Sequence, residues 1–163
     1  IVAVDNAPAM VERCSEIVAT DRSAGHEIPV DVTLGDVLDT PIENASMVVL
    51  NYTLQFVAPE RRDELIQRIA DGMVGGGLLV LSEKVVDEDP HMEELLFELH
   101  HEHKRRNDYS ALEISRKRAA LENVLIPETV AQHRERLLGA GFAHVAVWLR
   151  YFNFVSIIAI KPE

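Results

Sequence analysis

The sequence has one cysteine, no long apolar run and no basic segment at its start. A single cysteine, Cys14, excludes an internal disulfide framework and predicts a reducing, cytoplasmic location. No apolar run approaches the ~20 residues that a bilayer-spanning helix needs, so we expect no contact with a membrane. The first ten residues lack the basic region and cleavage site of a signal peptide. The length of 163 residues predicts a single domain over residues 1–163.

The sequence has fewer basic than acidic residues. The chain has 16 Lys and Arg against 27 Asp and Glu, which gives a formal net charge of −11. A protein that binds nucleic acid usually presents a broad basic surface, because it must displace the counterions of the phosphates. We therefore expect no direct binding of nucleic acid, and a small molecule is the better prediction for the ligand.

Short apolar segments alternate with segments of helical spacing along the chain. Strands are expected at residues 1–5, 28–39, 47–51 and 77–86, and as a pair around Asn153; helices are expected at 7–21, 61–77, 90–107, 110–124 and 127–141. This order predicts an α/β fold with a mainly parallel sheet and helices on both of its faces. The helical block at about 90–124 interrupts the alternation and is predicted to be an insertion over the sheet.

Polar residues stand at the ends of three expected strands. Asp5 ends the first strand, Asp36 follows the second in a Gly-Asp turn, and Asn51 ends the third. Ligands of open parallel sheets bind outside the carboxyl ends of the strands, where an acidic residue can accept hydrogen bonds from both ribose hydroxyls. Each residue alone is also an ordinary cap or turn residue. Three of them at successive strand ends favour a nucleoside site.

The glycine-rich turn that normally accompanies such an acidic residue is missing. The segment GMVGGG, residues 72–77, follows a helix and precedes a strand, which is the wrong order for a phosphate-binding loop, so we expect it to end the helix. If Asp5 binds the ribose, the glycine-rich turn belongs upstream of Ile1. We therefore expect an N-terminally incomplete chain that lacks the first strand of the fold and this loop.

Five segments together resemble the carboxy-S-adenosyl-L-methionine synthase family, which has the Rossmann-like class I methyltransferase fold. They are VDNAPAMVERC, GDVLDTPIENASMVVLNYTLQFV, GGGLLVLSEK, LHHEHKRRNDYSALEISRKRAALENVL and RLLGAGF. The resemblance runs nearly from end to end. It implies that Asp5 and Asn6 contact the ribose and that Asp36 and Val37 contact the adenine. It also implies that Asn51 makes a further contact with the cofactor and that Arg118 holds an added carboxylate.

The resemblance also implies a reaction and partners. Members of the family convert S-adenosyl-L-methionine (SAM) and prephenate to carboxy-SAM and phenylpyruvate. A separate tRNA carboxymethyltransferase then uses carboxy-SAM to complete a modification of the wobble uridine, and the synthase is expected to be a cytoplasmic homodimer. Two alternatives stay open: a SAM-dependent methyltransferase of a small acceptor, and a non-catalytic SAM-binding subunit.

Arg118 lies in a basic cluster whose members point in different directions. Ser110 and Glu113 predict a capping box at the start of a helix. Arg118 lies on this helix and shares its apolar face with Ile114 and Leu121. Arg116 is turned about 160° away, at about 100° per residue. A buried guanidinium needs an anion, and the spacing alone leaves a structural carboxylate and a ligand carboxylate equally open. The resemblance favours the ligand.

Three histidines precede this helix, but we expect no metal ion. His100, His101 and His103 are separated by one, two and three positions, whereas helical zinc sites favour a pair four residues apart. One of these histidines is instead expected to approach the ligand pocket.

Overall fold

The computed structural model describes residues 1–25, 28–107, 109–110 and 124–163, which form two compact units, Ile1–Pro41 and Ile42–Glu163. The second helix expected in the insertion, at residues 110–124, lies outside the described residues except at its two ends. Within the described part of the chain, no helix combines the length and the apolar character that crossing a membrane requires.

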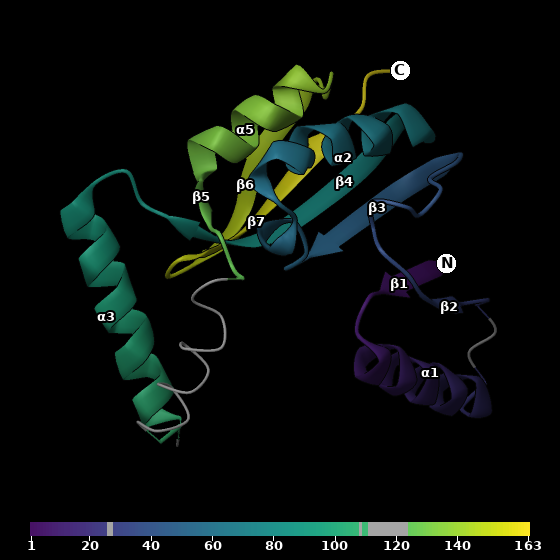
Figure 1. Cartoon of the computed structure of the whole chain (residues 1–163), viewed down its shortest axis with the longest axis horizontal. Coiled ribbons are helices and arrows are strands. Elements are labelled where there is room, and N and C mark those ends of the chain that lie inside the picture. Colours follow the sequence, from purple (N-terminus) through teal and green to yellow (C-terminus); the bar gives the residue numbers. More distant parts are fainter. Residues whose placement is uncertain (26–27, 108, 111–123) are drawn as a thin grey trace. The chain divides into compact units, whose positions relative to one another are not determined.

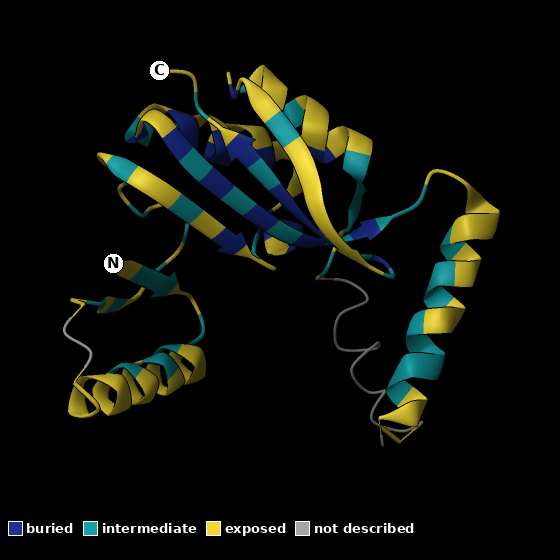
Figure 2. Ribbon diagram, turned by 180° about the vertical axis from the view of Figure 1, so that it is seen from behind, coloured by how far each residue is buried: buried dark blue, intermediate teal, exposed yellow. Residues whose placement is uncertain are grey.

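The first unit is a strand–helix–strand segment. It contains β1 (Val2–Asp5), α1 (Pro8–Ser23) and β2 (Asp31–Leu34), and the two strands are parallel with Val2 beside Asp31 and Asp5 beside Leu34. Pro8 begins the helix at a position where its missing N–H costs no hydrogen bond. The helix buries none of its residues and is mostly exposed (Figure 2). Both strands and the helix confirm the predicted order.

The second unit is built on a five-stranded sheet. Its elements are β3 (Ala45–Asn51), the 3₁₀ helix η1 (Leu54–Phe56), α2 (Pro59–Gly72), β4 (Met73–Val86), α3 (Pro90–Arg106), β5 (Glu128–Thr129), α5 (Val130–Gly139), β6 (His144–Tyr151) and β7 (Phe154–Ile160). The strand order is β3-β4-β7-β6, with β5 beside the end of β4. The pairs β3–β4 and β4–β5 are parallel, whereas β7 is antiparallel to both β4 and β6.

One face of this sheet and two helices form the core. Helices α2 and α5 lie side by side over the sheet (Figure 1). They bury Leu65, Ile66, Ile69 and Leu137, and the facing strand residues are equally inaccessible: Leu79, Leu81, Val85, Val155, Ile157 and Ala159. The spacing of three and four residues in α2 and of two residues in β4 places these side chains on one face of each element.

The glycines of residues 72–77 do not all end a helix, so this prediction was wrong in part. Helix α2 ends at Gly72, where an added Cβ would overlap the carbonyl oxygen of Ile42. The glycines at 75–77 already belong to β4, which begins four residues earlier than expected. The predicted helix at 127–141 begins later, at Val130, because Glu128 and Thr129 pair with β4 as a short strand. Thr129 and Gln132 then form a capping box.

A fully buried guanidinium connects the loop after β3 with the segment before α5. Arg62 donates to the carbonyl oxygens of Gln55, Val57 and Ile126, at 3.3, 2.9 and 2.9 Å, and its Nη1 lies 2.9 Å from a carboxylate oxygen of Glu128. Arg136 binds the same carboxylate through two hydrogen bonds of 2.7 and 2.8 Å. Burial alone would raise the pKa of Glu128, but the hydrogen bonds from both arginines outweigh it and hold the pKa below its usual range. Glu128 is therefore ionised at neutral pH.

Replacing Glu128 should strongly destabilise this protein. Glu128→Gln leaves the buried charge of Arg62 without its anion, and we expect the free energy of unfolding to fall by about 3–5 kcal/mol. Urea unfolding followed by circular dichroism measures the loss. Glu64→Gln is the control, because its ion pair with Arg61 is exposed to solvent and should contribute little to the free energy of unfolding. Equal losses in the two variants would contradict the structural role of Glu128.

Candidate functional site

The first unit places two predicted acidic residues at neighbouring strand ends. Asp5 is the last residue of β1 and pairs with Leu34, the last residue of β2. The amide of Gly35 donates to the carbonyl oxygen of Asp5 at 3.1 Å, and Asp36 follows directly. Asn6 comes directly after Asp5 and is exposed. Asp5, Asn6 and Asp36 therefore lie at the carboxyl ends of one parallel strand pair.

In each of the two carboxylates, one oxygen accepts a hydrogen bond from a backbone amide of its own turn. Asp5 Oδ1 accepts from the amide of Ala7, and Asp36 Oδ1 accepts from the amide of Leu38, both at 2.8 Å. These bonds fix the side chains against the backbone, and among the described residues no hydrogen bond occupies the second oxygen of either carboxylate. Asp5 and Asp36 are exposed, and Val37 is half-buried. This arrangement suits recognition of hydroxyl or amino groups.

Asn51 belongs to the second unit, where it ends β3 and lies beside Ser82 of β4. Ser82 Oγ is 2.9 Å from Ser156 Oγ, which also accepts a 2.8 Å hydrogen bond from Trp148 Nε1. A row of polar groups therefore crosses the sheet from Asn51 to β6. Arg118, the predicted carboxylate clamp, lies outside the described residues.

The loop after Asn51 is held by a buried carboxylate that the sequence analysis missed. Glu83 accepts hydrogen bonds from the amides of Thr53, Leu54 and Gln55, at 3.2, 2.8 and 3.1 Å. Its side chain thus caps η1. Tyr52, directly before these amides, has a φ of 56°, which a non-glycine residue adopts only when its surroundings enforce it. Glu83 therefore fixes the direction in which the chain leaves Asn51.

Burial raises the pKa of Glu83 to about 7, although the three amide donors and the charge of Arg62 act against the shift. The amide contacts favour the ionised carboxylate, but the neutral carboxyl group can also accept from amides, and burial favours this neutral form more strongly. The loop next to Asn51 is therefore coupled to a carboxyl group that titrates near neutral pH.

Aromatic rings gather where α3 meets the turn between β6 and β7. His100 lies 5.1 Å from Phe154, and Phe154 lies 5.8 Å from Tyr52, both with rings nearly perpendicular. Burial is the main cause that lowers the pKa of His100 to about 4, and the charges of Lys104 and Lys84 act in the same direction. This histidine is neutral at pH 7. Among the described residues, no group of three His, Cys, Asp or Glu side chains could hold a metal ion.

Curated proteins with related sequences share one name. No protein-family model matches the chain. The carboxy-S-adenosyl-L-methionine synthases of Trichlorobacter lovleyi and Marinobacter nauticus are 53% and 54% identical to it over 99% of its length. In sequence, the chain is similar to carboxy-S-adenosyl-L-methionine synthases. It spans 65% and 63% of the length of these two relatives.

Solved structures place the chain in a known fold. The SAM-dependent methyltransferase SibL matches 99% of it with a TM-score of 0.64 at 18% identity, and 43% of SibL is covered. Human N-acetylserotonin methyltransferase matches all of it with a TM-score of 0.59 at 20% identity, over 41% of that protein. The Rossmann-like methyltransferase fold predicted from the sequence is therefore confirmed.

Glu83 should make the stability of this protein depend on pH. Because the pKa of Glu83 in the folded state is above its ordinary value of 4.5, folding takes up a proton between about pH 4.5 and 7. The contribution of Glu83 to the free energy of unfolding is thus fully present below pH 4.5 and is lost as pH rises through 7. We expect the difference between the native protein and Glu83→Gln to fall by up to about 3 kcal/mol over this range.

Urea titrations at several pH values between 5 and 8 measure this difference. The control is again Glu64→Gln, because hydrogen bonding to Arg61 lowers the pKa of the exposed Glu64 and moves its titration below the range. A constant difference between the native protein and Glu83→Gln would show that Glu83 keeps one protonation state throughout.

Proposed function

We propose that this chain carries the SAM-binding residues of an enzyme that converts SAM and prephenate to carboxy-SAM and phenylpyruvate. The observation that supports the proposal best is the pair of acidic residues at adjacent strand ends, in a chain 53% identical to a carboxy-SAM synthase. The methyltransferase fold is compatible with a SAM site, because its parallel strands direct polar residues to their carboxyl ends.

The binding roles follow the chemistry of each residue. Asp5 and Asn6 bind the ribose hydroxyls, and the second oxygen of Asp5 is the acceptor that a hydroxyl needs. Asp36 and Val37 contact the adenine, Asp36 through its carboxylate and Val37 through its backbone. Asn51 contacts the cofactor from the end of β3. No metal ion takes part in the proposed reaction.

Arg118 recognises the carboxylate that distinguishes carboxy-SAM from SAM. The guanidinium is planar and presents paired N–H groups that match the two oxygens of a carboxylate, which a lysine cannot do. The sequence predicts Arg118 on an apolar helix face, where such a pair would be poorly hydrated and correspondingly strong. Arg118 is therefore the residue that we assign to the reacting group.

The reaction that we propose balances without an external base. The sulfonium of SAM acidifies its methyl group, and loss of a proton leaves an ylide. Prephenate loses carbon dioxide and its ring hydroxyl as hydroxide while its ring becomes aromatic; the hydroxide takes the methyl proton and becomes water. The ylide carbon then bonds to the carbon dioxide, which forms the carboxylate held by Arg118. Exclusion of water would protect the ylide.

The same assignment implies a setting for the protein. We propose a cytoplasmic homodimer that passes carboxy-SAM to a separate tRNA carboxymethyltransferase. The net charge of −11 supports this transfer of a small molecule, because so acidic a chain is poorly suited to binding tRNA itself.

Mass spectrometry tests the assignment most directly. We expect the intact protein purified from cells to release carboxy-SAM, and to form it from SAM and prephenate in solution. Release of SAM alone, with methylation of an added acceptor and no carboxy-SAM formed, would favour the alternative of an ordinary methyltransferase. Bound SAM without any turnover would favour a non-catalytic SAM-binding subunit.

Arg118→Leu should separate the two ligands. Removing the guanidinium should weaken carboxy-SAM binding by about 2–5 kcal/mol, because the added carboxylate loses its partner, while SAM binding changes little. Arg118→Lys keeps the charge without the planar fork and should fall between. Titration calorimetry of the intact protein with each ligand measures both effects.

Arg116→Leu is the matched control, because Arg116 is predicted on the opposite side of the same helix. It should leave the affinity for both ligands unchanged. If Arg118→Leu weakens SAM and carboxy-SAM equally and lowers the melting temperature sharply, Arg118 is a structural ion-pair residue.

A further inference from the structure

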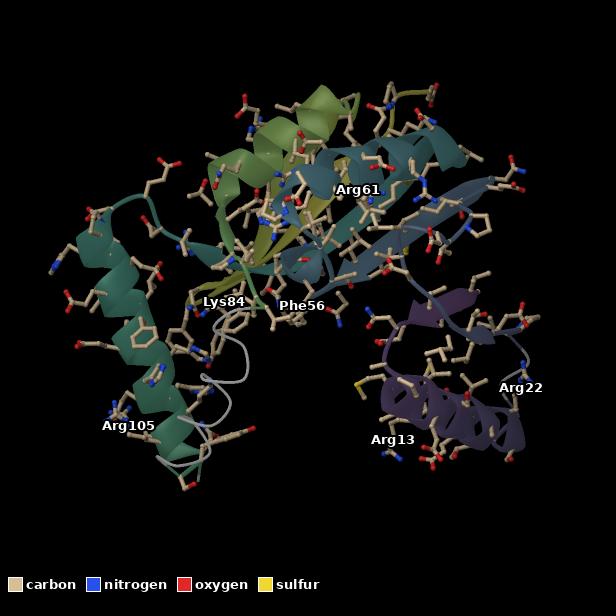
Figure 3. All side chains as sticks on the ribbon, viewed as in Figure 1. Arg13, Arg22, Phe56, Arg61, Lys84 and Arg105 are labelled. Carbon is tan, nitrogen blue, oxygen red and sulfur yellow. The ribbon has the colours of Figure 1, made fainter. Side chains whose placement is uncertain are left out.

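Lys84 lies on the same face of the sheet as Asn51, near the carboxyl ends of β3 and β4. Asn51 pairs with Ser82, and Lys84 follows Ser82 by two residues, so the three side chains leave the sheet on one side. Lys84 is therefore about 7 Å further along β4, in the direction in which the strands end. Figure 3 shows Lys84 at the end of the sheet nearest α3.

The aromatic cluster lies directly beside Lys84. Lys84 pairs with Phe154 of β7, whose ring contacts Tyr52 next to Asn51 and His100 of α3. Further ring contacts extend the cluster along the turn between β6 and β7, and its six members are Tyr52, His100, His103, Tyr151, Phe152 and Phe154. Tyr52 and Tyr151 are 42% and 54% exposed, so the cluster offers apolar ring surface to a ligand.

Positive charge accompanies this ring surface although the chain as a whole is acidic. The charges of Lys84 and Lys104 both act on His100. Within the described ranges, no carboxylate forms an ion pair with Lys84. Lys84 is also half-buried, and a partly desolvated ammonium gains more from an anionic partner than one in open water. An ammonium bordered by rings suits a molecule that is both cyclic and anionic.

We propose that Lys84 and the aromatic cluster form the subsite for the second substrate, an anionic ring carboxylate. This inference rests on the proposed function and adds to it the residues that recognise prephenate. Lys84 binds a carboxylate of this substrate, and the rings of Phe154, His100 and Tyr52 pack against its six-membered ring.

The subsite also suits the chemical change. The ring of prephenate is non-aromatic before it loses carbon dioxide and hydroxide, and aromatic afterwards. Perpendicular contacts between aromatic rings gain energy from the ring quadrupole, which the substrate acquires only as the reaction proceeds. Packing against Phe154 and His100 should therefore strengthen toward the transition state, and such differential binding is what accelerates a step.

Lys84→Met tests the subsite. In the intact protein we expect the KM for prephenate to rise about 10-fold to 100-fold, the loss expected for one charge-assisted hydrogen bond. The Kd for SAM, measured by calorimetry without prephenate, should stay within about twofold, because Lys84 touches only the second substrate. Lys84→Arg keeps the charge and should restore most of the affinity for prephenate. If Lys84→Met does not fold, Lys84→Gln replaces it in the same measurements.

Arg105→Met is the matched control. It also removes one positive charge, but Arg105 lies on the side of α3 turned away from the sheet (Figure 3) and should leave the KM for prephenate unchanged. An unchanged KM in Lys84→Met, or equal increases of KM in Lys84→Met and Arg105→Met, would overturn the subsite. The proposed function would still hold if the native protein forms carboxy-SAM. A native protein that forms no carboxy-SAM would overturn the proposed function itself.

Discussion

The buried guanidinium of Arg62 is the contact on which the second unit depends. It is fully inaccessible to solvent and donates hydrogen bonds to carbonyl groups of two separate loops. Glu128 neutralises its charge and also forms an ion pair with Arg136 of α5. Without this cation, the carbonyl oxygens of Gln55 and Ile126 would lose a donor inside the protein. Arg62 therefore ties its own helix to Ile126, which lies 64 residues later in the sequence.

Glu83 complements Arg62 from the strand side. Arg62 binds carbonyl oxygens of the loop after β3, and Glu83 binds amides of the same loop. A buried guanidinium and a buried carboxyl group therefore hold opposite groups of one short backbone segment. This explains how Tyr52 keeps a left-handed conformation next to Asn51. The position of a predicted ligand contact thus depends on residues that do not touch the ligand.

Most of the fold could be predicted from apolar periodicity, and the strand-end residues Asp5, Asp36 and Asn51 lie where it placed them. The two buried ionisable residues were missed, although each follows the pattern of its element. Glu83 is in phase with the buried Leu81 and Val85, and Arg62 is in phase with Leu65 and Ile66. Periodicity indicates which positions are buried. It does not indicate the partner of a charged residue at such a position, because that partner belongs to a segment distant in the sequence.

The row of hydrogen bonds that crosses the sheet has a practical consequence. Trp148 is the single tryptophan of the chain, and its indole donates to Ser156, which contacts Ser82 beside Asn51. The emission of an indole depends on the strength of its hydrogen bond and on its contact with water. The unlabelled protein therefore contains one fluorophore that is hydrogen-bonded toward the strand beside Asn51, and a shift of its emission on adding a nucleoside would give an optical readout of changes next to that strand end.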